Sequence, residues 1–238
     1  MSNTNVQVNT NESSTSFFSR LKKLGEKIIN TVKKFYSKVK ERITFPPHVQ
    51  QQLRDQYEQK PELQITSQEC ENVNEQIVGH MQRTFDNKDP GTYLTSLETM
   101  EQKEKTLRIF SEKLFKIYGL KDVTVQMDYL DSGTAGYYSF DKRKLVVNMS
   151  YLSFDNPILE RDAVDTILHE TRHAVQHAAM HGNNPLGFDD ATIIEWIKNK
   201  KNYIRASNDP VGYRTQALEA DAWSTARYNM YSYLQSIK

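Results

Sequence analysis

The chain has 238 residues, of which 37% are hydrophobic and 26% are charged, and this composition suits one globular domain with appendages. Its formal net charge is only +1, yet residues 1–45 hold nine Lys and Arg against three Glu, so the basic character is local. The single cysteine, Cys70, excludes an intramolecular disulfide and cysteine-based zinc or redox motifs, which leaves His, Asp and Glu as candidate metal ligands.

The N-terminal segment, residues 1–16, is rich in Asn, Ser and Thr, and we expect it to be disordered. It lacks a charged stretch followed by an apolar core, so we expect no secretory signal peptide. No run in the chain approaches the length of a membrane-spanning apolar segment. We therefore expect a protein that stays in the cytoplasm or is exported without such a signal, peripheral to a membrane at most.

Residues 17–45 are predicted to form a basic amphipathic helix. Apolar residues recur there at three- and four-residue steps, with lysines between them. Such a helix suits either an anionic membrane surface or a protein partner, which includes the following domain, and both alternatives stay open. Nucleic acid is not expected as a partner, because the lysines supply charge without an element that reads bases.

A boundary is predicted at Phe45-Pro46-Pro47, because proline ends the preceding helix. The remainder, 46–238, is expected to be one catalytic domain with a helical N-terminal part, 46–119, and a core, 120–238. Within the helical part, residues 48–60 are predicted to be a short helix or a linker.

Two longer helices are predicted before residue 120. A capping-box pattern at 66–69 begins the first, whose buried face would be Val73, Ile77, Met81 and Phe85. After a turn at 89–91, apolar residues spaced at helical intervals predict one long helix that ends at Gly119.

The periodicity then changes from that of helices to that of strands. Residues 123–127 alternate as a strand, and 137–140 with 145–147 predict a hairpin closed at 141–144. We therefore expect a small antiparallel sheet ahead of the next helix.

Three helices are predicted after the sheet, which makes the fold class α+β and mostly helical. The first begins at Asn156-Pro157 and ends at Gly182, because Asn is a favourable cap, Pro suits the first turn and Gly ends helices. The second spans about 192–200. The last begins at Asp209-Pro210 and runs toward the C-terminus.

The first of these three helices carries the sequence His-Glu-x-x-His at residues 169–173. Residues four apart share one helix face, so His169 and His173 can turn their rings toward one metal ion. Glu170 then lies beside the metal without being a ligand, which is where the general base for a zinc-activated water belongs.

A catalytic zinc normally has three protein ligands, so a third donor is needed. His177 is four residues beyond His173, but it lies about 12 Å from His169 along the helix axis and is expected only in the second shell. Glu219 and Asp221 are better candidates, because they are acidic residues among alanines on a helix and need a partner when buried.

The order of hairpin, His-Glu-x-x-His helix and downstream helix with an acidic ligand resembles the zincin metallopeptidases of the glutamate-zincin type, notably small bacterial effector, toxin and mobile-element versions. The resemblance covers about residues 120–230. It implies a zinc metallopeptidase, with Zn2+ held by His169, His173 and Glu219, with Glu170 as general base and with a peptide or protein substrate.

The chain departs from the zincin pattern at two positions. Arg172 stands where an uncharged residue is usual, and Trp223 stands where thermolysin-like relatives have an acid. Asp221 could replace that acid as second-shell partner of a ligand histidine, or it could pair with Arg172 and tie the two helices together.

Three questions stay open from the sequence. Tyr213 is the candidate catalytic donor to the oxyanion, with Tyr137 and Tyr138 as alternatives. Either hairpin strand could bind an extended substrate along its edge. A zincin-fold binding module without catalytic activity is the alternative function.

Overall fold

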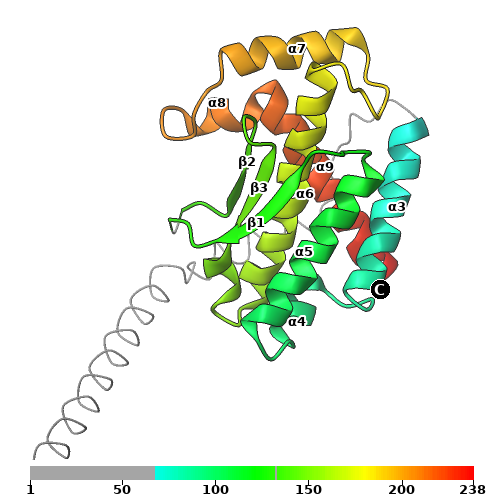
Figure 1. The fold of residues 1–238 in the computed structure, drawn as a ribbon, viewed down its shortest axis with the longest axis vertical. Helices are drawn as coiled ribbons and strands as arrows, with labels where there is room; N and C mark the ends of the chain where they lie inside the picture. The colour runs from blue at the N-terminus through cyan, green and yellow to red at the C-terminus, as the bar shows by residue number, and fades with distance from the viewer. Residues whose placement is uncertain (1–67, 132) are drawn as a thin grey trace, which may run out of the picture. The chain divides into compact units, whose positions relative to one another are not determined.

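The computed structural model describes residues 68–131 and 133–238 (Figure 1). In this part of the chain the fold is α+β and mostly helical, with a small sheet ahead of the longest helix, as predicted. No helix of the described residues is both long and apolar enough to cross a membrane. The predictions for 1–16, 17–45 and 48–60 concern residues outside the described part.

Seven α-helices, one 3-10 helix and three strands make up the described residues. In chain order they are α3 (Gln68–Thr84), α4 (Pro90–Thr95), α5 (Met100–Ile117), β1 (Thr124–Asp128), β2 (Gly136–Ser139), β3 (Lys144–Asn148), η1 (Met149–Leu152), α6 (Pro157–Met180), α7 (Asp190–Lys201), α8 (Pro210–Thr215) and α9 (Ala217–Ser236).

The prediction of one long helix after residue 91 is wrong, because two caps divide the segment. The Asp89 side chain accepts a hydrogen bond from the Thr92 amide and begins the short helix α4. Thr99 then begins α5 through a complete capping box with Gln102. These side chains satisfy amide groups that a continuous helix would have bonded internally, so the chain turns between α4 and α5.

The sheet is mixed and has the strand order β1-β3-β2. Strands β2 and β3 form the predicted antiparallel hairpin, whereas β1 pairs with β3 in parallel. The buried side chain of Asn148 shapes the connection after β1: it accepts from the Leu130 amide and donates to the Thr134 carbonyl oxygen at 2.7 Å. The chain can thus pass over β3, which leaves β1 and β2 as the two edges.

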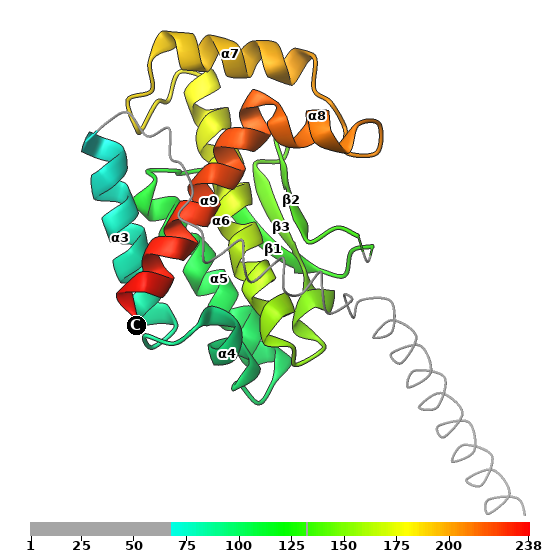
Figure 2. The same cartoon turned by 180° about the vertical axis from the view of Figure 1, so that it is seen from behind.

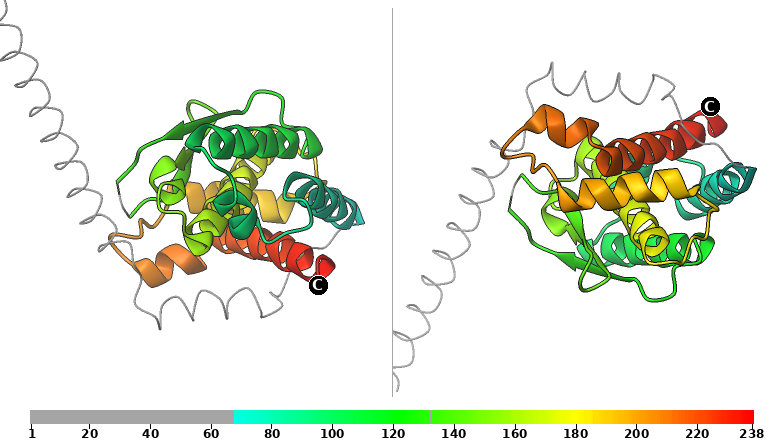
Figure 3. Two further views of the ribbon diagram at one scale, coloured as in Figure 1. Left: turned by 90° about the horizontal axis from the view of Figure 1, so that it is seen from below. Right: turned by 90° about the horizontal axis from the view of Figure 1, so that it is seen from above.

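Helix α6 runs between the sheet and α5 on one side and α9 on the other (Figures 2 and 3). It begins at the predicted Asn156 cap. Two glycines permit close contact with it. A Cβ atom at Gly91 would collide with the Pro157 carbonyl, and one at Gly136 would lie 2.7 Å from the Thr166 side chain. The sheet and α4 therefore pack directly on the α6 backbone and side chains.

The prediction of one helix from residue 209 to the C-terminus is wrong in one respect. Gln216 adopts an extended conformation and separates α8 from α9. Its side chain bonds both the amide and the carbonyl of Ile204 and accepts from Asn199, which holds it outside a helix. Consequently α9 begins at Ala217, and Glu219 lies in its first turn against α6.

Candidate metal centre

His169 and His173 on α6 meet Glu219 of α9 in one buried triad. The two Nε2 atoms are 3.1 Å apart. Glu219 Oε2 lies 3.3 Å from His169 Nε2, and Oε1 lies 3.2 Å from His173 Nε2. The three residues are 4%, 7% and 1% exposed, respectively. Their ligand atoms all lie within 4.8 Å of one another, which makes this a possible metal-binding site.

The triad has the spacing that a tetrahedral metal site requires. Nitrogen and oxygen ligands about 2.0–2.1 Å from a tetrahedral ion lie about 3.3 Å from each other. The observed separations of 3.1, 3.2 and 3.3 Å agree with this value. The donor set of two imidazoles and one carboxylate therefore fits a zinc-type ion and resembles the His-Glu-x-x-His plus Glu site of zincins.

The electrostatics of the triad demand a positive charge at its centre. Burial by itself lowers the pKa of His173, but the carboxylates of Glu219 and Glu170 outweigh it and raise this pKa to about 9. Burial likewise raises the pKa of Glu219, yet hydrogen bonds from His169 and His173 hold it well below its ordinary value. The metal-free triad therefore retains a proton between its ligand atoms, in the position that a metal ion could take.

Glu170 lies beside the triad and is not part of it. Its Oε1 is 4.0 Å from His169 Nε2, and its side chain is 12% exposed, so the carboxylate can reach water. An acidic group that is partly accessible to solvent thus lies next to the triad.

Two tyrosines lie near Glu219. The Tyr203 hydroxyl donates to Glu219 Oε1 at 2.5 Å, and Tyr213 lies beside it. Burial and the charge of Glu219 raise the pKa of both phenols, so each keeps its proton. Tyr213 was a candidate from the sequence. Tyr203, in the segment between α7 and α8, was missed, because no motif distinguishes it from the other tyrosines among the 13 of the chain.

The hairpin tyrosines do not join the triad. Tyr138 is buried, and its hydroxyl lies 3.0 Å from His177 Nδ1. Burial and the nearby charges of His181, Lys200 and Arg143 lower the pKa of His177 to about 4, so its imidazole is neutral. Tyr137 is exposed on β2. His177 is thus held by the hairpin and lies outside the triad.

Arg172, one of the two departures from the zincin pattern, binds Asp221, as one of the two alternatives for Asp221 predicted. Both guanidinium contacts with the carboxylate measure 2.8 Å, and Gln176 donates to the same carboxylate at 2.6 Å. Asp221 therefore ties α6 to α9, and it reaches His173 only through Gln176. Trp223 packs its ring against His169, with 4.5 Å between the ring centroids.

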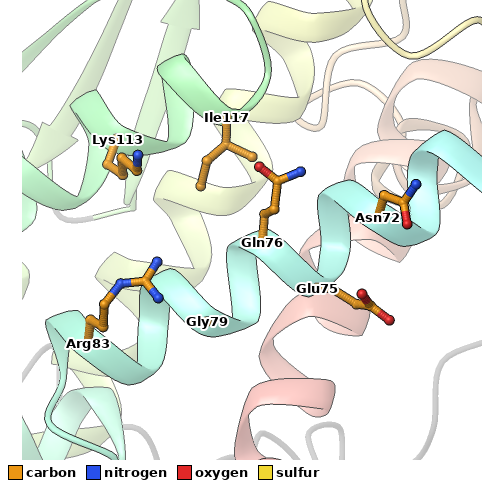
Figure 4. A pocket seen from close by; sticks show the side chains of 7 residues that line it. All are labelled: Asn72, Glu75, Gln76, Gly79, Arg83, Lys113 and Ile117. Atoms are coloured by element: carbon orange, nitrogen blue, oxygen red, sulfur yellow. The ribbon is translucent and has the colours of Figure 1, made fainter.

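The groove in Figure 4 is separate from the triad. It has a volume of roughly 540 Å³ and is lined by residues of α3 and α5, including Gln76, Arg83 and Lys113. No triad residue lines it, and no histidine does.

No family model matches the chain, and neither the curated proteins nor the solved structures contain a match to it. The similarity to zincins therefore rests on the triad, on Glu170 and on the order of the elements that carry them.

Proposed function

We propose that this chain is a zinc-dependent metallopeptidase in which His169, His173 and Glu219 hold the metal. The observation that carries the proposal is the spacing of 3.1–3.3 Å among the ligand atoms of these three side chains. A zinc ion bound there would supply Lewis acidity, which activates a water molecule and polarises the scissile carbonyl.

Glu170 is proposed as the general base. It follows the first ligand in the chain, its carboxylate lies 4.0 Å from His169 Nε2, and it is partly exposed. A carboxylate in this position can accept a proton from water and deliver it to the leaving nitrogen of the substrate. Its location supports this role better than that of any other acidic residue near the triad.

Tyr213 is proposed to donate a hydrogen bond to the oxyanion that forms when the peptide carbonyl is attacked. A neutral phenol is required for this role, and burial raises the pKa of Tyr213, so that its hydroxyl keeps the proton. Tyr203 lies next to it with a ring-centroid distance of 6.2 Å and binds Glu219. The two phenols therefore supply hydroxyl groups on the α7–α8 side of the triad.

The proposed substrate is an extended peptide or protein segment that binds along β2. Strand β3 is paired on both sides, which leaves β2 as the hairpin strand with an open edge among the described residues. Gly136 of this strand lies close to the Thr166 side chain, and the Tyr138 hydroxyl lies within hydrogen-bonding distance of His177. Strand β2 therefore lies along the part of α6 that carries His169 and His173. An extended substrate could pair with such an edge through its main chain.

For residues 17–45 we retain the proposal of a basic amphipathic helix that binds an anionic membrane surface or a protein partner. Targeting of this kind would suit an effector protease, and it changes the location of the enzyme without changing its chemistry. Vesicles with and without anionic lipid test it: loss of co-sedimentation with anionic vesicles in a chain that begins near Pro46 supports membrane binding.

The catalytic proposal is tested by metal content and peptide cleavage in matched glutamate variants. Zinc per chain is measured by mass spectrometry, and cleavage is measured on a pool of unstructured peptides. Glu170→Gln should keep its zinc and lose activity by about 100-fold or more. Glu219→Gln should lose zinc. Glu195→Gln, a change at an exposed position of α7, should alter neither.

Each possible failure has a distinct meaning. A wild-type protein without zinc affinity would remove the metal site. Unchanged zinc binding in Glu219→Gln would exclude Glu219 as a ligand. Zinc binding without cleavage of any peptide would favour the inactive binding module.

A further inference from the structure

We infer that Gln176 is the positioning residue that fixes the ring of His173 and thereby selects Nε2 as its metal-binding nitrogen. Gln176 lies one turn after His173 on α6 and is fully buried. Its Oε1 lies 2.8 Å from His173 Nδ1. This inference rests on the proposed metal site, but it concerns how the site is built and not what the enzyme cleaves.

The orientation of the Gln176 amide is determined at its other end. Its Nε2 atom donates to the Leu218 carbonyl oxygen at 2.9 Å and to Asp221 Oδ2 at 2.6 Å. Both partners can only accept hydrogen bonds, because one is a carbonyl and the other a carboxylate. The amide nitrogen must therefore face them, and the amide oxygen must face His173.

His173 consequently carries a proton on Nδ1, which it donates to Gln176. Its Nε2 atom faces His169 and Glu219, where a metal ion would take the place of a proton. Metal-binding histidines usually donate their second ring N–H to a partner in this way, and the partner contributes to metal affinity. The partner is usually a carboxylate or a carbonyl, and here it is a neutral amide.

Asp221 is itself held by contacts with Arg172. Arg172 binds its carboxylate through two parallel hydrogen bonds of 2.8 Å. The Arg172 guanidinium lies 4.6 Å from the centre of the Phe188 ring, which packs against it. Arg172, the arginine within the His-Glu-x-x-His segment, therefore orients Asp221 and, through Gln176, the proposed ligand His173.

The two histidines differ in this respect. His169 Nδ1 is buried and has no hydrogen-bond partner among the described residues. The ring of His169 is held by contact with Trp223 instead. The hydrogen-bonded control of ring orientation thus acts on His173, and Gln176 is the residue that exerts it.

The test compares two substitutions of Gln176, one that removes the acceptor for His173 and one that keeps it. Gln176→Leu removes the acceptor, and we expect zinc affinity to fall by about 10- to 100-fold in competition with a chelator. Gln176→Glu keeps it, and we expect affinity within a few-fold of wild type. Gln82→Leu on α3 is the matched control, because among residues 68–131 and 133–238 the side-chain amide of Gln82 bonds only Ser236.

A second readout does not depend on zinc. The Nδ1 proton of His173 should be protected from exchange in nuclear magnetic resonance spectra of the metal-free wild type, because it is buried against Gln176. Gln176→Leu should remove this protection, and Gln82→Leu should leave it intact. A purely structural role for Gln176 would not change the state of one particular ring proton.

Gln176→Glu places a second carboxylate beside Asp221, so its effect could reflect repulsion. Gln176→Glu combined with Asp221→Asn moves the negative charge instead of adding one, and it keeps the acceptor for His173. Affinity close to wild type in the double variant supports the inference.

A double variant as weak as Gln176→Leu overturns the inference, and so does a Gln176→Leu protein with unchanged affinity and ring-proton protection. Failure of the proposed function looks different, since the wild type would then bind no zinc while the ring proton still responds to Gln176→Leu.

Discussion

Two buried carboxylates, Glu160 on α6 and Glu219 on α9, are neutralised in different ways. Glu160 lies in the first turn of α6, and its carboxylate accepts hydrogen bonds from the Lys103 ammonium at 2.7 Å and from the Thr95 hydroxyl at 3.0 Å. The Glu219 carboxylate lies 3.2 and 3.3 Å from the Nε2 atoms of two imidazoles and accepts a hydrogen bond from the Tyr203 hydroxyl. Among the described residues, Glu160 faces an ammonium group that stays charged far above neutral pH, whereas Glu219 faces two imidazoles and a neutral phenol.

This difference separates a structural ion pair from a binding site. A buried carboxylate costs several kcal/mol unless a cation accompanies it. Lys103 supplies that cation from within the fold, so the Glu160 pair is complete. The Glu219 triad is complete only when a proton or a metal ion is added between its ligand atoms. The predictions below test whether the two regions respond as this comparison requires.

Lys103→Met should produce the largest effect. It leaves Glu160, which is fully buried, without its cation, and the free energy of unfolding should fall by about 3–5 kcal/mol. Urea unfolding measures the loss. Lys103→Met combined with Glu160→Gln should recover most of it, because no charge then remains buried. Equal stability of the single and double variants would contradict the assignment of a structural ion pair.

The second prediction concerns pH in the metal-free protein. Folding raises the pKa of His173 from 6.5 to about 9, so its contribution is fully present below pH 6.5 and is lost as the pH rises toward 9. The loss should be on the order of 3 kcal/mol, since one pKa unit corresponds to about 1.4 kcal/mol. Unfolding is measured with a chelator at pH 6–9, and Glu219→Gln should flatten the profile.

The opposite sign applies to Glu219 at acidic pH. Its pKa is depressed in the folded protein, so its contribution is present above the ordinary value of 4.5 and is lost as the pH falls below it. Lys103 itself should add no slope between pH 6.5 and 9, because its pKa is raised above 10.5. A steep slope that persists in Glu219→Gln would place its origin outside the triad.

The triad could be predicted from the sequence, whereas the Lys103–Glu160 pair could not. The spacing of His169 and His173 lies within one helix, and Glu219 stood out as an acid among alanines. The Lys103–Glu160 pair joins residues 57 positions apart and carries no local signal. Local periodicity reports which face of a helix is buried, but it does not report which charged residues meet across two helices.

The break between α8 and α9 and the pairing of β1 were missed for the same reason, whereas the break between α4 and α5 comes from local caps. The break at Gln216 depends on hydrogen bonds to Ile204, and the parallel pairing of β1 depends on the buried side chain of Asn148. Both are contacts with distant segments that override the local preference for a continuous helix or a simple hairpin sheet. Tyr203 and the orientation of Gln176 likewise became apparent only in three dimensions.

Zinc should stabilise the fold through the Glu219 triad and not through the Lys103–Glu160 pair. At a free zinc concentration roughly 100 times the dissociation constant, the free energy of unfolding should rise by about 2.7 kcal/mol. Glu219→Gln should abolish most of this gain, whereas Lys103→Met combined with Glu160→Gln should retain it. The measurement is thermal or urea unfolding with and without zinc. A gain that survives Glu219→Gln would show that zinc binds elsewhere.

The smallest effect is expected at the two hydroxyl groups that serve the buried carboxylates. Tyr203→Phe and Thr95→Val each remove one donor, and each should cost about 1 kcal/mol in the metal-free protein. Zinc should reduce the cost of Tyr203→Phe, because the ion then shares the charge of Glu219. It should not change the cost of Thr95→Val, because Lys103 already neutralises Glu160.

The comparison needs a control for the tyrosine, since any phenol could affect stability. Tyr129→Phe removes a hydroxyl from an exposed residue and should cost little with or without zinc. The decisive quantity is therefore the difference between the zinc-dependent change in Tyr203→Phe and that in Thr95→Val, measured by urea unfolding. If zinc changes both costs equally, the two carboxylates are electrostatically alike, and the division into a structural pair and a metal site fails.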